Sequence, residues 1–221
     1  MREIYLASQP SVASRGARGL RSVRNLLFGL LVFSTVAPAW AQRYKTIPAM
    51  PRREAQSLER NVRAAIQNPS GFGAASEDVK TYFTKYYFPN MTSTDAQKLG
   101  ELGDSREDLF KRYLRNISNP ASLAELTKLC LGVSRVLAID NYHPAVRYNA
   151  TLIIGNLDSR NATGDDPPVP LPEGTALLLD LLEKDTMERR GTELAVHPVV
   201  KTGALVGLER HARYGIEERF A

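Results

Sequence analysis

The chain has 221 residues and a formal net charge of +5 at pH 7, from 29 Lys and Arg residues against 24 Asp and Glu residues. Most of this excess is N-terminal: residues 1–41 hold five Arg and one Glu, which leaves 24 basic and 23 acidic residues in 42–221. A nearly neutral chain has no basic excess to follow a phosphate backbone, so the charge gives no support to a nucleic-acid partner.

Residues 1–41 have the layout of a secretory signal peptide. Arginines precede an apolar run at 26–37, and Ala39-Trp40-Ala41 fits the small-x-small rule for cleavage. The alternative is a membrane anchor, but the run is shorter than the roughly 20 residues that span a bilayer. We therefore expect cleavage after Ala41, export to the periplasm or the extracellular space, and no membrane span in the exported protein.

Cys130 is the only cysteine, so no internal disulfide can form. It lies among leucines in "LAELTKLCLGVSRVLAI", and we expect a small buried side chain there. The alternative is a reactive thiol or an intermolecular bridge.

Helical patterns follow one another along the chain after a proline-containing linker at 42–51. Apolar residues recur at helical spacing, breakers separate the runs, and no stretch keeps a period of two. We therefore predict an all-α protein with an N-terminal helical region at 52–120. The expected helices are 52–67, 77–88, 95–102, 105–117, 121–139, 144–157, 173–184 and 198–214.

Two segments of the C-terminal half, 143–157 and 197–208, repeat one motif 54 positions apart. In both, His-Pro is followed by valine, a basic residue and alanine. The matched residues are His143, Pro144, Val146, Arg147 and Ala150 in the first copy, and His197, Pro198, Val200, Lys201 and Ala204 in the second.

Each copy can be explained as the second helix of a helix pair. Proline suits the first turn of a helix, where its missing N–H had no partner, and alanine on the buried face allows close approach. One pair cannot cover its own apolar face, so neighbouring pairs must stack. We therefore expect stacked antiparallel helix pairs over 121–221.

The segments "HPAVRYNATLIIGNL" and "HPVVKTGALVGLERH" resemble the second helix of HEAT repeats. The resemblance covers 121–214 and implies an α-α superhelix with 52–120 as an N-terminal cap. It also implies acidic partners for the basic residues, Asp140 for Arg147 and Glu193 for Lys201. The spacing of 54 exceeds the roughly 40–47 residues usual for these repeats, and we assign the surplus to loops at 158–172 and 186–196.

The sequence carries no recognisable catalytic, cofactor or metal site. It has no nucleophile elbow, and no glycine loop follows a strand. His143 and His197 could bind a metal with Asp140 or Glu193, but a role in the turn and first helical residues explains their repetition better. The third histidine, His211, is expected to be a structural or surface residue.

The densest aromatic patch is "TYFTKYYF" at 81–88, with Tyr82, Tyr86 and Tyr87. Two interpretations are open: packing against the helix at 108–117, or an exposed surface that binds a ligand or a partner.

These features favour an exported, non-enzymatic helical-repeat protein that binds another protein in the cell envelope, with self-association as a way to extend its surface. The alternative is an accessory subunit or a small-ligand binder that uses the aromatic helix. The resemblance adds a chromophore-handling role to this alternative, because HEAT-like repeats occur in proteins resembling phycobiliprotein lyases. Sequence alone does not identify the partner.

Overall fold

The computed structural model describes residues 44–183, 187–189, 192–194 and 198–215. The expected signal peptide and His197 lie outside the described residues. Residues 44–51, the described part of the expected linker, form no helix or strand. The described residues from Tyr44 onward belong to one compact unit.

The described chain is mostly helical, and this confirms the predicted all-α class. The first half contains α2 (Arg52–Gln67), the 3-10 turn η1 (Gly73–Ala75), α3 (Ser76–Tyr82), η2 (Phe83–Tyr87), α4 (Phe88–Asn90), α5 (Ala96–Gly100), α6 (Leu102–Asp108), η3 (Leu109–Tyr113) and η4 (Leu114–Asn116). The second half contains α7 (Pro120–Ile139), α8 (Pro144–Asn156), α9 (Pro172–Glu183) and α10 (Pro198–Tyr214).

Local chemistry explains most of the helix starts. The side chain of Asp95 accepts hydrogen bonds from the backbone N–H groups at the start of α5, and Asn119 does the same for α7. The helix expected from residue 77 begins at Ser76, whose hydroxyl donates a hydrogen bond to Glu125. The start expected near residue 105 is wrong, because α6 already begins at Leu102.

Two helices of the first half contain π-helical segments, η2 and η3. A π segment places one extra residue in a turn and changes the direction of the side chains that follow. Both segments carry aromatic residues into the core, so the aromatic patch owes its position to them.

Two short antiparallel strand pairs correct the expectation that strands are absent. β1 (Asp158–Arg160) pairs with β2 (Val169–Pro170), and β3 (Met187–Arg189) pairs with β4 (Thr192–Leu194). They lie within the two segments expected to be loops. Strands of two or three residues are too short to produce a period-two pattern in the sequence.

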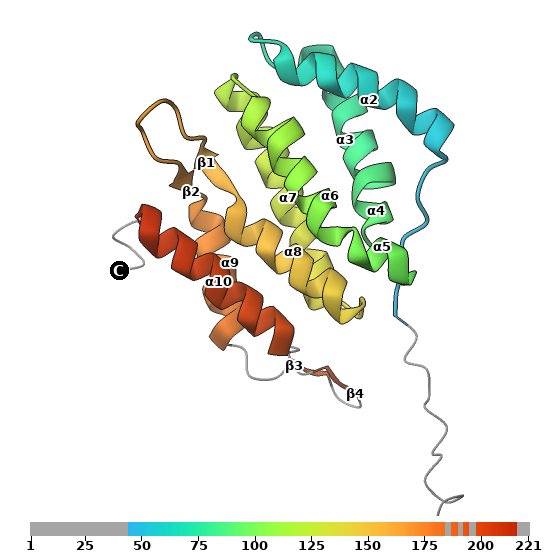
Figure 1. Ribbon diagram of the computed structural model, residues 1–221, viewed down its shortest axis with the longest axis vertical. Helices are drawn as coiled ribbons and strands as arrows, with labels where there is room; N and C mark the ends of the chain where they lie inside the picture. Colours follow the sequence, from blue (N-terminus) through green and yellow to red (C-terminus); the bar gives the residue numbers. More distant parts are fainter. Residues whose placement is uncertain (1–43, 184–186, 190–191, 195–197, 216–221) are drawn as a thin grey trace, which may run out of the picture. The chain divides into compact units, whose positions relative to one another are not determined.

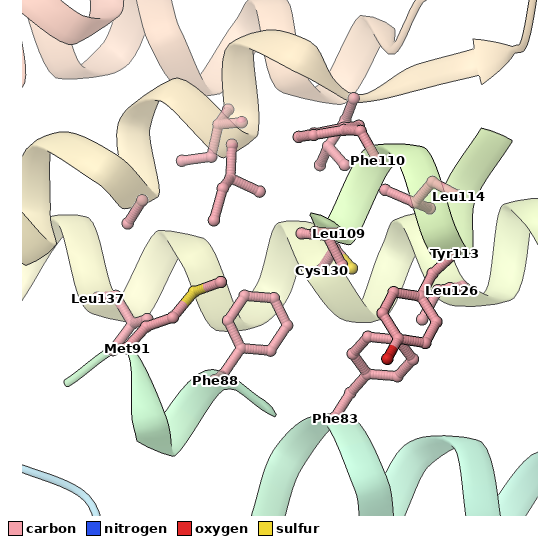
Figure 2. Packing of buried hydrophobic residues seen from close by; sticks show 14 of the residues in the cluster. Phe83, Phe88, Met91, Leu109, Phe110, Tyr113, Leu114, Leu126, Cys130 and Leu137 are labelled. Atoms are coloured by element: carbon pink, nitrogen blue, oxygen red, sulfur yellow. The ribbon is translucent and has the colours of Figure 1, made fainter. Parts of the chain in front are cut away.

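One hydrophobic core joins the first half of the described chain to α7 and α8. Figure 2 shows Phe83 and Phe88 packed beside Leu109, Tyr113 and Cys130. Cys130 is fully buried, as expected, and burial raises the pKa of its thiol far above the ordinary value.

In the second half, α7 packs against α8 and α9 against α10. Helices α8 and α10 also lie side by side, and they run in the same direction (Figure 1). Two contacts in order along both helices establish the direction, Thr151 with Gly203 and Gly155 with Gly207, and Asp158 just after α8 continues the order by contacting Arg210.

Candidate functional site

The repeated motif lies where two helices begin. His143 caps α8, because its Nδ1 accepts a hydrogen bond from the backbone N–H of Ala145 at 3.2 Å, and Pro144 is the first helical residue. Pro198 begins α10 in the same way. The role of the first histidine is therefore helix capping, while that of His197 lies outside the described residues.

The apolar motif residues face the core in both copies. Val146 and Ala150 on α8 are buried, and so are their counterparts Val200 and Ala204 on α10. The alignment of the two segments at an offset of 54 thus matches residues with equal burial.

The basic motif residue of the first copy has a partner that sequence analysis did not predict. Arg147 is 5% exposed, and its Nε donates a hydrogen bond of 2.9 Å to the carbonyl oxygen of Ala138 near the end of α7. Asp140, the expected partner, forms its ion pair with Lys45 at 3.0 Å instead. Burial lowers the pKa of Arg147, and the carboxylate of Asp140 opposes this shift from a distance. Lys201 is half-buried, and the side chain of Glu193 is outside the described residues.

Glycines let α8 and α10 approach each other at backbone distance. A Cβ placed on Gly155 would lie 2.5 Å from the Cα of Gly207, and one placed on Gly203 would lie 3.0 Å from the Cβ of Thr151. Spacings of four residues between small side chains on both helices create this contact. The sequence contains this signal, but it does not say which helix is the partner.

A partly buried polar cluster lies at the same contact between α8 and α10, which we call the junction. Both carboxylate oxygens of Asp158 accept hydrogen bonds of 2.8 Å from Arg210, whose guanidinium also lies 5.3 Å from the centre of the Tyr214 ring. His211 is fully buried, with Nε2 3.1 Å from the carbonyl oxygen of Gly155 and Nδ1 2.7 Å from the hydroxyl of Thr175.

The partners of His211 fix its protonation state. Because the carbonyl can only accept, Nε2 carries the hydrogen and Nδ1 accepts from Thr175. Burial, with the nearby charge of Arg210, lowers the pKa of His211 to about 4. Burial raises the pKa of Asp158, against the opposing effect of Arg210. His211 is thus a structural residue, one of the two roles expected for it.

The outward side of α10 carries an exposed stripe, which we call the stacking face: the apolar residues Leu205 and Val206, with Thr202 and Glu209 beside them. Leu205 is 58% exposed and Val206 47% exposed. At the offset of 54, their counterparts on α8 are Thr151 and Leu152, which are 0% and 9% exposed and lie on the helix that α10 covers. The two helices therefore carry equivalent positions, and only the stripe on α8 is covered.

The aromatic candidate surface is mainly part of the core. Tyr82 is 2% exposed and its hydroxyl lies 2.9 Å from that of Tyr113; its ring also contacts Tyr86 and Tyr87. Tyr87 is half-buried and donates a hydrogen bond of 2.6 Å to the backbone of Ser105. Burial raises the pKa of Tyr82 and Tyr87 well above the ordinary range. Tyr82 cannot belong to an exposed surface, because it lies at the end of α3 and packs against Tyr113 of η3.

Substitution of Tyr82 by Phe is expected to lower the free energy of unfolding by about 1 kcal/mol, because the Tyr113 hydroxyl stays buried without its partner. Tyr86→Phe is the matched control, since Tyr86 is half-buried in the same cluster and should change stability little. Chemical denaturation of both variants measures the difference. Equal stability of the two variants would contradict the assigned role of the hydroxyl pair.

Surface hollows in the described region do not gather catalytic groups. One of about 230 Å³ is lined by Arg63, Lys111 and Arg112, together with Ile66, Gln67 and Asn116. Each of the three cations already pairs with an acidic residue four positions earlier on its own helical stretch. Among the described residues, no group of three or more His, Cys, Asp or Glu could hold a metal, and no helix is long and apolar enough to cross a membrane.

Comparison with protein-family models, with curated proteins and with solved structures gave no match for this chain. The stacking face and the junction beneath it are therefore interpreted from their own geometry.

Proposed function

We propose that the protein is an exported, non-enzymatic scaffold of HEAT-like helix pairs that binds another protein in the cell envelope. The observation that carries the proposal is the exposure of Leu205 and Val206 at positions whose counterparts on α8 are covered by the next helix pair. A helix-pair stack buries its apolar faces only where a neighbour follows. The stacking face therefore has the character of a site for another helical element.

The arrangement of the second half supports the repeat interpretation. Two antiparallel pairs follow each other, their second helices run in parallel, and the equivalent residues Val146 and Val200 are both buried. The export part of the proposal rests on the sequence of residues 1–41. The ligand-binding alternative is less favoured. It requires an exposed aromatic surface at 77–88, whereas Tyr82 in this segment is buried.

The test is a comparison of surface variants in capture from the envelope fraction of the protein's own host. Each apolar side chain buried on binding contributes about 1.5 to 3 kcal/mol, so Leu205→Glu with Val206→Glu should weaken partner capture at least about tenfold. Val136→Glu is the matched control, because Val136 is 50% exposed on α7. Mass spectrometry of the captured proteins, with circular dichroism to verify folding, gives the readout.

A partner that the wild type and Val136→Glu retain, and that the double variant loses, supports the proposal. Sedimentation analysis shows whether this partner is a second copy of the chain. Identical capture by all three proteins would contradict a binding role for the stacking face.

A further inference from the structure

A small cavity lies between α7, η4 and the segment where α8 is followed by β1. It has a volume of about 10 Å³, and its lining includes Thr127, Asn156, Asp158 and Asn161 together with Arg115. A cavity of this size accommodates about one water molecule, provided that two to four polar groups surround it.

Thr127 supplies a polar group without a partner. The residue is 2% exposed, and its Oγ1 forms no hydrogen bond with any described residue. A buried hydroxyl in this state costs free energy comparable to a lost hydrogen bond. Such groups in folded proteins are commonly satisfied by an ordered water.

The other lining groups are rich in acceptors. Asn156 donates its amide nitrogen to the carbonyl of Leu152 at 2.8 Å, and Asn161 donates to Leu114 at 2.9 Å. Each amide keeps its Oδ1 for another donor. The carboxylate of Asp158 adds further acceptor positions beside those taken by Arg210.

The polar groups of the lining favour water over a small anion or a metal cation as the occupant of the cavity. An anion would lie near the carboxylate of Asp158, which repels it. A metal cation would face Arg115, and Asp158 is already paired with Arg210, so no uncompensated negative charge attracts it. A water molecule can donate two hydrogens to these acceptors and accept one from Thr127.

We propose that the cavity binds one ordered water molecule, which links the Thr127 hydroxyl on α7 to the polar groups at the end of α8. Asp158 continues this link to Arg210 on α10. The water thus joins three helices of the two stacked pairs and helps to fix their relative position. The proposal is independent of the function proposed above, because it concerns the stability of the stack.

Thr127→Val gives a test in which the sign of the effect decides. Valine has nearly the same shape as threonine and lacks the hydroxyl. With a bridging water, the variant loses hydrogen bonds and its unfolding equilibrium constant rises about fivefold. Without the water, the variant removes only an unpartnered hydroxyl, and the constant falls.

Ser134→Ala is the reference variant. Ser134 is fully buried on the same helix, its Oγ also has no partner among the described residues, and it is not among the residues that line this cavity. Its unfolding constant should stay unchanged or fall, while Thr127→Ser should retain the water. A fall in the constant of Thr127→Val overturns the proposal.

A crystal structure at a resolution that shows ordered water gives a direct decision. We expect one water within about 3.2 Å of Thr127 Oγ1 in the wild type. An unoccupied cavity in clear density would overturn the proposal, whatever the stability of the variants.

Discussion

Replacement of Gly155 by alanine is expected to lower the free energy of unfolding by about 2 kcal/mol. The new Cβ would lie 2.5 Å from the Cα of Gly207, a distance that forces α8 and α10 apart. Overpacking of a close contact costs about 1 to 3 kcal/mol or more, and here the obstacle is backbone, which cannot rotate away. The gain in helix propensity from glycine to alanine, up to about 1 kcal/mol, offsets only part of this cost.

Gly132→Ala is the matched control for this experiment. Gly132 lies within α7, and a Cβ added there would have nothing within 4 Å. This variant should gain about 0.5 to 1 kcal/mol, because alanine is the better helix former. Urea denaturation of both variants measures the two effects, and equal stabilisation of both would show that α8 and α10 do not approach at Gly155.

The stability of the protein is expected to fall as the pH is lowered from 6.5 to 4, by up to about 3 kcal/mol, through His211. In the folded protein the pKa of His211 is lowered to about 4, first by burial and then by the charge of Arg210; the hydrogen bond to Gly155 opposes both. The unfolded chain, with the ordinary value near 6.5, binds the proton first. The contribution of His211 to the free energy of unfolding is therefore fully present above pH 6.5. It declines as the pH falls through this window and is lost below pH 4.

A variant that cannot titrate isolates this contribution. His211→Gln should be less stable than the wild type at pH 7, but its stability should change less between pH 6.5 and 4. The raised pKa of Asp158 acts in the opposite direction, since its protonation at low pH favours the folded state, and it is present in both proteins. Denaturation at a series of pH values measures the two slopes, and parallel curves would contradict the assignment to His211.

The two effects concern one junction, formed by Gly155 and Asp158 on one side and Gly207, Arg210 and His211 on the other. The first tests its shape and the second its buried polar groups. Under the proposed function, a change to the shape or to the polar groups of this junction should also weaken partner capture, because the junction holds α10, which carries the stacking face.

Helix positions could be predicted from the sequence because they depend on neighbouring residues. Proline at 120, 144 and 198 begins α7, α8 and α10, and capping by Asn119 and His143 needs only the first turn. The repeated motif also indicated which residues of α8 and α10 are buried, since burial on one side of a helix follows the helical period.

Only the tertiary structure decided which partners these residues meet. Arg147 reaches the Ala138 carbonyl instead of Asp140, and Tyr82 at the end of α3 lies in the core beside Tyr113 of η3. The exposure of Leu205 and Val206 likewise depends on whether another element follows α10. The helical pattern sets the direction of a side chain relative to its own helix, whereas its contacts depend on how separate helices come together.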